Sequence, residues 1–191
     1  MRYAFVSDIH SNWQAWTAVL ADIRQQNVDS IICLGDIIGY GPRPVEVLES
    51  VYQECSHVVM GNHDAVIGGI LDADLFNDNA RSIIEWTKER LNDHAQAYFA
   101  DLPIVIDGDL FSIAHSEFAV PERFGYINTA EDACESFDVS PADLMFVGHT
   151  HKPGVFINND VTGEISGFDG RSFQQEAQKR YICNVGRTVP M

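Results

Sequence analysis

The chain has 191 residues, of which 46% are apolar, and a formal net charge of −16 from 28 acidic and 12 basic residues. This length and apolar content are typical of one folded domain, so we expect a single domain over residues 1–191 and exclude a disordered chain. The acidic balance argues against long nucleic acids as partners, because it repels their phosphate backbone and no basic stripe offsets it.

The sequence also predicts where the protein works. It contains no run of about 18 apolar residues, so we expect no membrane span. The N-terminus enters a strand pattern without the basic and apolar regions of a signal peptide, which predicts a cytoplasmic protein. The cysteines form no close pair and indicate small buried residues of a reduced compartment: Cys33, Cys55, Cys134 and Cys183. Whether the chain forms a homo-oligomer stays open.

The first half of the chain alternates between two hydrophobic patterns. Short apolar runs predict strands, and apolar residues repeated every three or four positions predict helices between them. Ser11 or Asn12 would begin the first helix, and Pro44 suits the first turn of the second. The expected elements are strands 2–7, 30–34 and 57–60 and helices 13–26, 44–53 and 80–92.

The second half is richer in strands. Thr129 and Asp132 resemble a capping box, which predicts a helix that runs from there to Phe137. Strand-helix units followed by a strand-rich half suggest an α/β fold of two packed sheets with helices outside. The expected strands are 111–114, 144–147, 153–157, 164–168 and 181–184.

Polar residues follow the apolar runs at their carboxyl ends, where open α/β sheets build their sites. Such residues suit two divalent ions about 3.5–4 Å apart, because a carboxylate can bridge the ions while imidazoles and carbonyl oxygens fill each shell. A lone Asp or His is more often a turn or surface residue, but the repetition favours a two-metal site. The residues are Asp8, His10, Asp36, Asn62, His63, Asp64, His115, His149 and His151.

In this order, the motifs resemble the calcineurin-like metallophosphoesterase superfamily over almost the whole chain, from Met1 to about Gly186. The run Gly35–Pro42 resembles the small bacterial and archaeal phosphodiesterase branch of that superfamily. The resemblance implies a four-layer αββα sandwich of two mixed β-sheets flanked by helices, with metals on the loops after the strands. Tyr40 and Arg43, in and beside this run, either contact the substrate or only pack within their loop.

The resemblance implies a role for each of these polar residues. Asp8, His10, Asp36 and His151 resemble the ligands of one metal, and Asp36, Asn62, His115 and His149 those of the other. Asp36 would then bridge the two ions. His63 resembles a catalytic histidine outside the ligand shell, and Asp64 resembles the carboxylate that orients its ring.

The implied activity is hydrolysis of small phosphate esters by direct attack of a metal-bound hydroxide. Phosphodiesters are the main expected substrates. His63 would stabilise the developing charge or protonate the leaving oxygen. These ligands suit two divalent ions. Mn²⁺ is the expected metal, and Fe²⁺, Ni²⁺ or Zn²⁺ are alternatives. The alternative substrates are a phosphomonoester, such as a phosphoprotein, or a dinucleoside polyphosphate. A non-catalytic scaffold is a further alternative, which the retained ligands and His63 disfavour.

Three features depart from the family pattern. His115 is followed by Ser116, where this branch usually has glycine. The run 184–187 reads Asn-Val-Gly-Arg where the family commonly has Asn-Pro-Gly-Ser, so Arg187 could lie close enough to bind a phosphate. Family members usually continue for another pair of strands beyond this point. We therefore expect either a short C-terminal part or a fragment.

Overall fold

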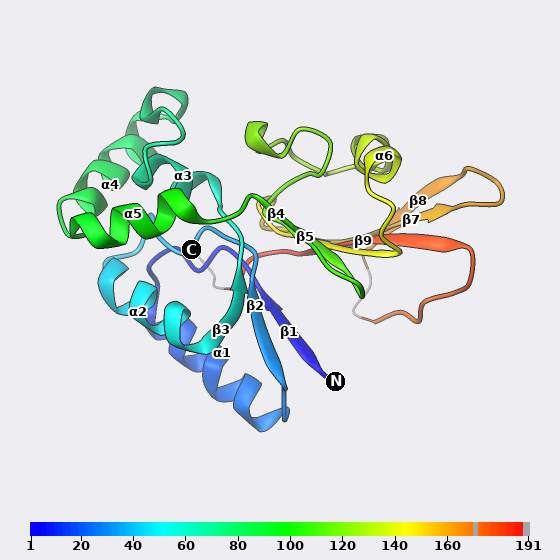
Figure 1. Cartoon of the computed structure of the whole chain (residues 1–191), viewed down its shortest axis with the longest axis horizontal. Helices are drawn as coiled ribbons and strands as arrows, with labels where there is room; N and C mark the ends of the chain where they lie inside the picture. The colour runs from blue at the N-terminus through cyan, green and yellow to red at the C-terminus, as the bar shows by residue number, and fades with distance from the viewer. Residues whose placement is uncertain (170–171, 189–191) are drawn as a thin grey trace.

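The structure is a computed structural model that describes residues 1–169 and 172–188. Figure 1 shows two sheets packed against each other, with helices on the outer side of each. The chain end at Met191, on which the expectation about further C-terminal strands rests, lies outside the described residues. The strands are β1 (Tyr3–Val6), β2 (Ser30–Cys33), β3 (Cys55–Val58), β4 (Val105–Asp107), β5 (Ser112–Ala114), β6 (Leu144–Val147), β7 (Pro153–Asn159), β8 (Ile165–Phe168) and β9 (Lys179–Val185).

The helices cover the strands and connect them. Helices α1 and α2 each connect one strand to the next, and α3, α4 and α5 lie in succession between β3 and β4. The α-helices are α1 (Trp13–Gln25), α2 (Pro44–Glu54), α3 (Asn62–Ile67), α4 (Asp78–Lys88), α5 (Asp93–Asp101) and α6 (Ala130–Val139). Two short 3₁₀ helices are η1 (Ala73–Leu75) and η2 (Pro121–Arg123). No α-helix within the described ranges is long and apolar enough to span a membrane.

The two sheets differ in strand direction. In the described residues, one sheet has the order β1-β2-β3 and the other the order β4-β5-β6-β9-β7-β8. Two packed sheets are present as expected, although the described strands of the first sheet, β1, β2 and β3, all pair in parallel. Helices α1 and α2 make the crossover connections that parallel neighbours need. The second sheet is mixed, since β5, β6 and β9 run parallel and β4 and β7 run antiparallel to their neighbours.

Three apolar clusters define four layers. The largest packs α1 and α2 against the first sheet, and includes the fully buried Trp16. A second packs α6 against the other sheet around Phe137. Between the sheets, the rings of Phe5 and Phe146 stack with centroids 3.6 Å apart and an angle of 12°. The structure thus confirms the expected order of helices, sheet, sheet and helices.

Capping side chains explain where several helices begin. Asn12 Oδ1 accepts a hydrogen bond from the Ala15 amide and begins α1, as expected. The capping box of Thr129 and Asp132 is also present at α6, which extends to Val139. The expected helix 80–92 is wrong at both ends. Asn77 begins α4 at Asp78, and α4 ends at Lys88.

Asn92 marks the start of a helix rather than its end. Its side chain accepts a hydrogen bond from the Ala95 amide and begins α5, which the apolar pattern did not predict. Helix α5 packs against α3 through its buried residue Phe99. The cysteines are free, but Cys134 is exposed on α6, so the expectation that all four are buried is wrong there.

Candidate metal centre

The loops that follow five strands bring the predicted ligands to one edge of the fold. Strands β1, β2, β3, β5 and β6 each end immediately before a loop or helix turn that carries one or two of these residues. Because parallel strands share a direction, their carboxyl ends meet at one edge of each sheet. The side chains gathered there are Asp8, His10, Asp36, Asn62, His115, His149 and His151.

Most of these ligand positions have an unusual backbone conformation. The φ angle is 55° at Asp8, 51° at His10, 52° at Asp36, 64° at His149 and 60° at His151. A non-glycine residue with positive φ costs of order 1–3 kcal/mol, and such residues cluster at functional sites. The surrounding hydrogen bonds maintain these strained conformations. The strain indicates that the placement of the side chains matters more here than local stability.

One group of ligand atoms forms around Asp8. Its Oδ1 lies 3.1 Å from His151 Nε2 and 3.8 Å from His10 Nε2, and the two imidazole Nε2 atoms are 3.2 Å apart. Asp8 Oδ2 accepts a hydrogen bond from the His149 amide. These atoms lie close enough together to hold one metal ion.

A second group forms around His115. Its Nε2 lies 3.5 Å from Asp36 Oδ2, 3.2 Å from Asn62 Oδ1 and 3.1 Å from His149 Nδ1. Asp36 Oδ2 also lies 3.8 Å from His10 Nε2 in the first group. The Asp36 carboxylate therefore stands between the two groups, as a bridging ligand would.

Hydrogen bonds outside the groups determine how two of the rings present their nitrogens. His10 Nδ1 lies 3.1 Å from the Ile38 carbonyl oxygen, and His115 Nδ1 lies 2.7 Å from that of Leu34. A carbonyl oxygen only accepts, so each Nδ1 carries the proton and, in the neutral ring, each Nε2 presents a lone pair. These lone pairs face other acceptor atoms. Such an arrangement is unfavourable without a cation among them, so the residues fit divalent metal ions.

The charges of the centre lead to the same conclusion. Burial lowers the pKa of His115, but the charges of Asp36 and Asp8 and the bond to the Leu34 carbonyl outweigh burial and raise it to about 9. Burial opposes ionisation of Asp36, but His115, His63 and His10 hold its pKa well below the usual range. A protonated imidazole thus supplies positive charge where a metal ion would otherwise supply it.

His63 lies beside both groups, with its ring buried among other rings. Its centroid is 5.1 Å from that of His10, 4.8 Å from Tyr40 and 5.1 Å from Phe76. Burial lowers the pKa of His63 to about 4, so the ring is neutral at neutral pH. A Cβ atom on Gly39, whose φ is +94°, would lie 2.6 Å from His63 Nδ1. Glycine is therefore needed at position 39 to leave room for this ring.

Asp64 has a different role from the expected one. Its carboxylate accepts hydrogen bonds from the backbone amides of Ile37 at 3.1 Å, Ile38 at 3.4 Å and Gly61 at 3.1 Å. Across the described part of the chain, none of its hydrogen bonds reaches the His63 ring. Burial, followed by the charge of Asp36, raises the pKa of Asp64 to about 7. Asp64 thus ties the loop after β2 to the start of α3, and orders His63 only through the backbone.

Tyr40, Arg43 and Arg187 differ in their position relative to the pocket. Tyr40 lines the pocket over the centre and contacts His10 edge-on, at 4.9 Å between centroids. Arg43 instead pairs with Glu46 at 2.7 Å, so it packs near its own helix. Neither Arg43 nor Arg187 is among the residues described as lining the pocket.

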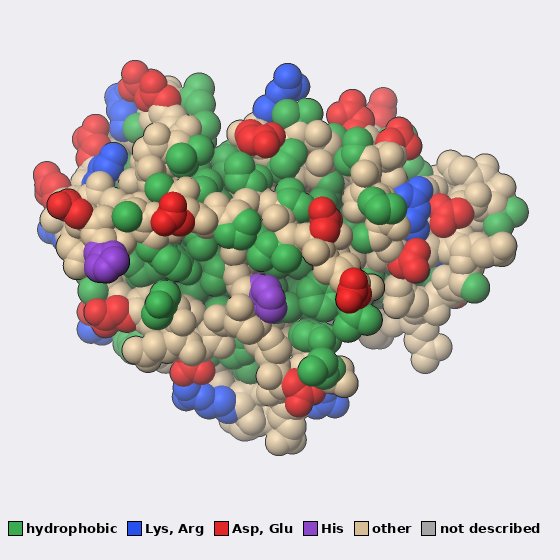
Figure 2. Space-filling model, in the orientation of Figure 1, with side chains coloured by type: hydrophobic (Ala, Val, Ile, Leu, Met, Phe, Trp, Pro, Cys, Tyr) green, Lys and Arg blue, Asp and Glu red, His purple; other side chains and the backbone are tan. Residues whose placement is uncertain are grey.

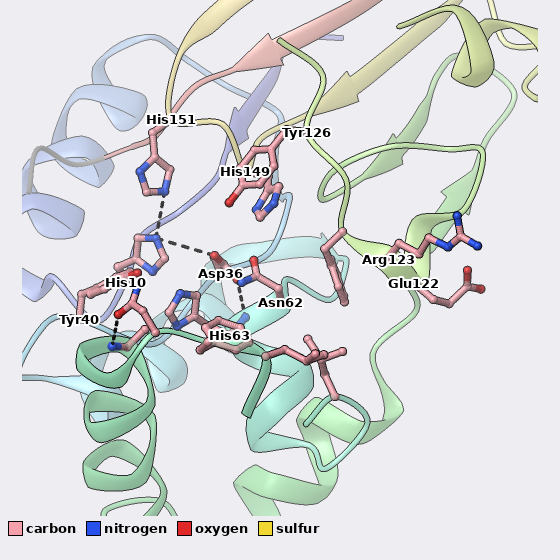
Figure 3. A pocket seen from close by; sticks show the side chains of 16 residues that line it. His10, Asp36, Tyr40, Asn62, His63, Glu122, Arg123, Tyr126, His149 and His151 are labelled. Carbon is pink, nitrogen blue, oxygen red and sulfur yellow. Dashed lines mark hydrogen bonds and ion pairs between the residues drawn. The ribbon is translucent and has the colours of Figure 1, made fainter. Parts of the chain in front are cut away.

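The pocket itself has a volume of about 550 Å³ and includes a wall that the sequence did not reveal. Figure 3 shows His10, Asp36, Asn62, His149 and His151 directed toward its floor. The remaining wall comes from the segment around η1, the start of α4, and η2 with the loop after it. No periodic pattern or glycine-rich motif marked these residues, which are Leu71, Leu75, Phe76, Asn77, Ala80, Glu122, Arg123, Phe124 and Tyr126.

Comparisons with known proteins agree with this fold and identify the family. Residues 1–184 match the model of the calcineurin-like phosphoesterase superfamily domain. The uncharacterized protein MJ0912 of Methanocaldococcus jannaschii is 34% identical over 189 residues, which are 96% of this chain and 74% of that protein. A metallophosphoesterase from Sphaerobacter thermophilus superposes with a TM-score of 0.83 at 34% identity, over 98% of this chain and 77% of that one.

A more distant structure shares only the fold. The hypothetical protein PH1004 of Pyrococcus horikoshii superposes with a TM-score of 0.67 at 17% identity, over 87% of this chain and 86% of that one. Taken with the family match, the chain belongs to the calcineurin-like phosphoesterase superfamily, as its motifs predicted. It is accordingly a hydrolase of phosphate esters that uses divalent metal ions.

Metal binding should stabilise the folded protein, because the ligands converge only after folding. At a free Mn²⁺ concentration about 100 times Kd, the free energy of unfolding should rise by about 2.7 kcal/mol, and Tm by roughly 5–10 °C. Calorimetry of the metal-stripped protein, with and without Mn²⁺, measures this shift. His115→Ala should lose most of it, whereas His57→Ala, which changes an exposed histidine of β3, should keep it. An unchanged wild-type Tm would contradict metal binding at this centre.

Proposed function

We propose that residues 1–191 form one phosphoesterase domain that hydrolyses small phosphate esters, preferably phosphodiesters, at a centre of two divalent ions. The observation that carries this proposal is the position of Asp36. Its Oδ2 lies 3.8 Å from His10 Nε2 and 3.5 Å from His115 Nε2. These two nitrogens belong to different groups of ligand atoms. A single carboxylate shared by two such groups suits a pair of ions better than two separate sites.

The proposed ligands are those implied by the family motifs. When bound, the divalent ions would activate water and neutralise charge on the phosphoryl oxygens. The imidazole and amide ligands suit Mn²⁺ first, with Fe²⁺, Ni²⁺ or Zn²⁺ as alternatives. One ion would be held by Asp8, His10, Asp36 and His151, and the other by Asp36, Asn62, His115 and His149.

His63 is the proposed catalytic side chain that reaches the substrate. It lines the pocket, and it is neutral at neutral pH because burial lowers its pKa to about 4. A neutral imidazole still carries one N–H group, which can donate a hydrogen bond to a phosphoryl or leaving-group oxygen as negative charge develops there. We therefore favour charge stabilisation over proton donation for this ring. Water, rather than a side chain, would be the nucleophile.

The charge of the pocket wall favours diesters. A monoester carries a second negative charge that the surrounding side chains would have to balance. Arg123 is the only Lys or Arg among the residues described as lining the pocket, and Glu122 lies next to it. Figure 3 shows both side chains pointing away from the histidines. A diester carries one negative charge, so it needs less positive charge from the side chains of the pocket wall.

The outer surface argues for a small substrate. The chain carries a net charge of −16, and Figure 2 shows Lys and Arg scattered among Asp and Glu on the viewed face. A long nucleic acid would meet repulsion over most of such a surface. The other candidates remain a phosphomonoester and a dinucleoside polyphosphate.

The preference for diesters can be measured directly. With Mn²⁺ saturating, we expect kcat/KM for bis(p-nitrophenyl) phosphate to exceed that for p-nitrophenyl phosphate, which has the same leaving group, by about tenfold or more. Both assays use metal-stripped protein to which Mn²⁺ is returned. A preference for the monoester would move the assignment to a phosphatase. No turnover of either ester, with two ions shown to be bound, would support the scaffold alternative.

A further inference from the structure

Tyr126 offers one face of its ring to the pocket. Its other face stacks on the His149 ring, with centroids 4.2 Å apart and an angle of 19° between the planes. The residue is nevertheless 59% exposed, and it lines the pocket above the ligand groups. A ring covered on one side can be this exposed only if its second face is open. Figure 3 shows Tyr126 lying against His149 at the pocket.

The backbone that carries Tyr126 is held in place on both sides. Phe124 has a left-handed conformation, with φ 50° and ψ 48°, and its ring is buried in a cluster with Met60. Gly125 lies next to the side chain of Glu117. Ile127, on the far side, is also buried. The exposed ring of Tyr126 therefore stands on an ordered segment, which reduces the entropy lost when a ligand stacks on it.

Two neighbouring residues of this wall are apolar and line the same pocket. Leu75 is 72% exposed although it lines the pocket, and Phe76 next to it contacts His63 edge-on. Exposed apolar side chains that gather at a pocket rim mark a surface that a ligand can cover. A group attached to the phosphate would lie here, because the pocket is continuous from the ligand groups to this wall.

We propose that Tyr126 and Leu75 form a subsite for a flat aromatic ring, so that the preferred substrates are small phosphate esters bearing an aryl or nucleoside group. This inference rests on the proposed function and adds the chemistry of one of the groups on the ester. An aromatic ring fits better than an alkyl chain, because stacking on Tyr126 adds about 0.5–1.5 kcal/mol beyond the area buried.

Two non-hydrolysable ligands can test the subsite without relying on turnover. Benzylphosphonate and cyclohexylmethylphosphonate carry the same anion on rings of similar size, but only the first ring is flat and aromatic. Calorimetric titration of the Mn²⁺-loaded protein should show that benzylphosphonate binds about 3- to 10-fold more tightly. Tyr126→Leu should abolish this ratio, whereas Tyr126→Phe should preserve it.

The control changes an equally exposed tyrosine elsewhere. Tyr52 on α2 is 70% exposed and lies outside this pocket, so Tyr52→Leu should leave the ratio at its wild-type value. Because each ratio compares two ligands on one variant, a change in metal content that affects both ligands alike cancels. Equal affinities in the wild type, or a ratio unchanged by Tyr126→Leu, would overturn the subsite while leaving the proposed function intact. If neither phosphonate binds and no ester is hydrolysed, both proposals fail.

Discussion

Asp36→Asn should reduce kcat/KM for any phosphate ester by at least about 10³-fold, and should lower the occupancy of both metal positions. The carboxylate oxygen Oδ2 is buried and stands between His10 Nε2 at 3.8 Å and His115 Nε2 at 3.5 Å. An amide keeps the shape but removes the negative charge that both ions would share. Activity measurements should be paired with metal analysis by mass spectrometry.

A matched control separates this effect from a general change in charge. Asp109→Asn removes one negative charge from an exposed loop position between β4 and β5, and should leave both activity and metal content unchanged. Asp36→Asn should also fold, because the amide oxygen can still accept the hydrogen bond that the His63 backbone amide donates to Oδ1 at 3.0 Å. Two ions bound to Asp36→Asn with wild-type affinity would show that Asp36 is not the bridge.

His63→Ala should lower kcat by about 10²–10⁴-fold while metal content stays close to that of the wild type. The ring lines the pocket and can donate a hydrogen bond to the reacting phosphate, but the motifs place it outside the ligand shell. His63→Gln should recover part of the loss, because the amide also has an N–H group. The measurement is kcat with saturating diester, together with metal analysis.

His63 could instead be a metal ligand. Together with His10 and Asp36, it forms a third group of side chains that could hold an ion. If His63→Ala loses one ion, His63 is a ligand and the proposed role is wrong. Gly39→Ala offers an independent check, since the new Cβ atom would press on His63 Nδ1 from 2.6 Å and displace the ring without removing it. It should lower kcat in the same direction, whereas the exposed-site variant His57→Gln should not.

The positions of most strands, and of the polar side chains that follow them, were predictable because both depend on local patterns. A strand needs only a few consecutive apolar residues, and a ligand at its carboxyl end needs only its place next to the strand. Asp8 after β1, Asp36 after β2 and His149 after β6 all follow this rule. Helix starts at Asn12 and Thr129 were also predictable, since a capping side chain acts within three residues.

Predictions failed where a residue's partner is distant in the chain. The apolar pattern merged α4 with the loop after it and did not reveal α5, because α5 depends on packing against α3 rather than on its own periodicity. Asp64 follows His63 directly in the chain, yet its carboxylate bonds to amides 26 and 27 residues earlier. Adjacency in sequence was therefore a poor guide to what this side chain orients.

The amino-acid sequence by itself determined which side chains can bind metal and at which strand ends they stand. Only the tertiary structure decided that Asp36 lies between two groups, that His10 meets His151, 141 positions later in the chain, and that Tyr126 stacks on His149. The reason is physical: strand and cap patterns report interactions over a few residues, whereas the distances between loops arise from how two sheets pack. That packing is a property of the whole core, which no short segment contains.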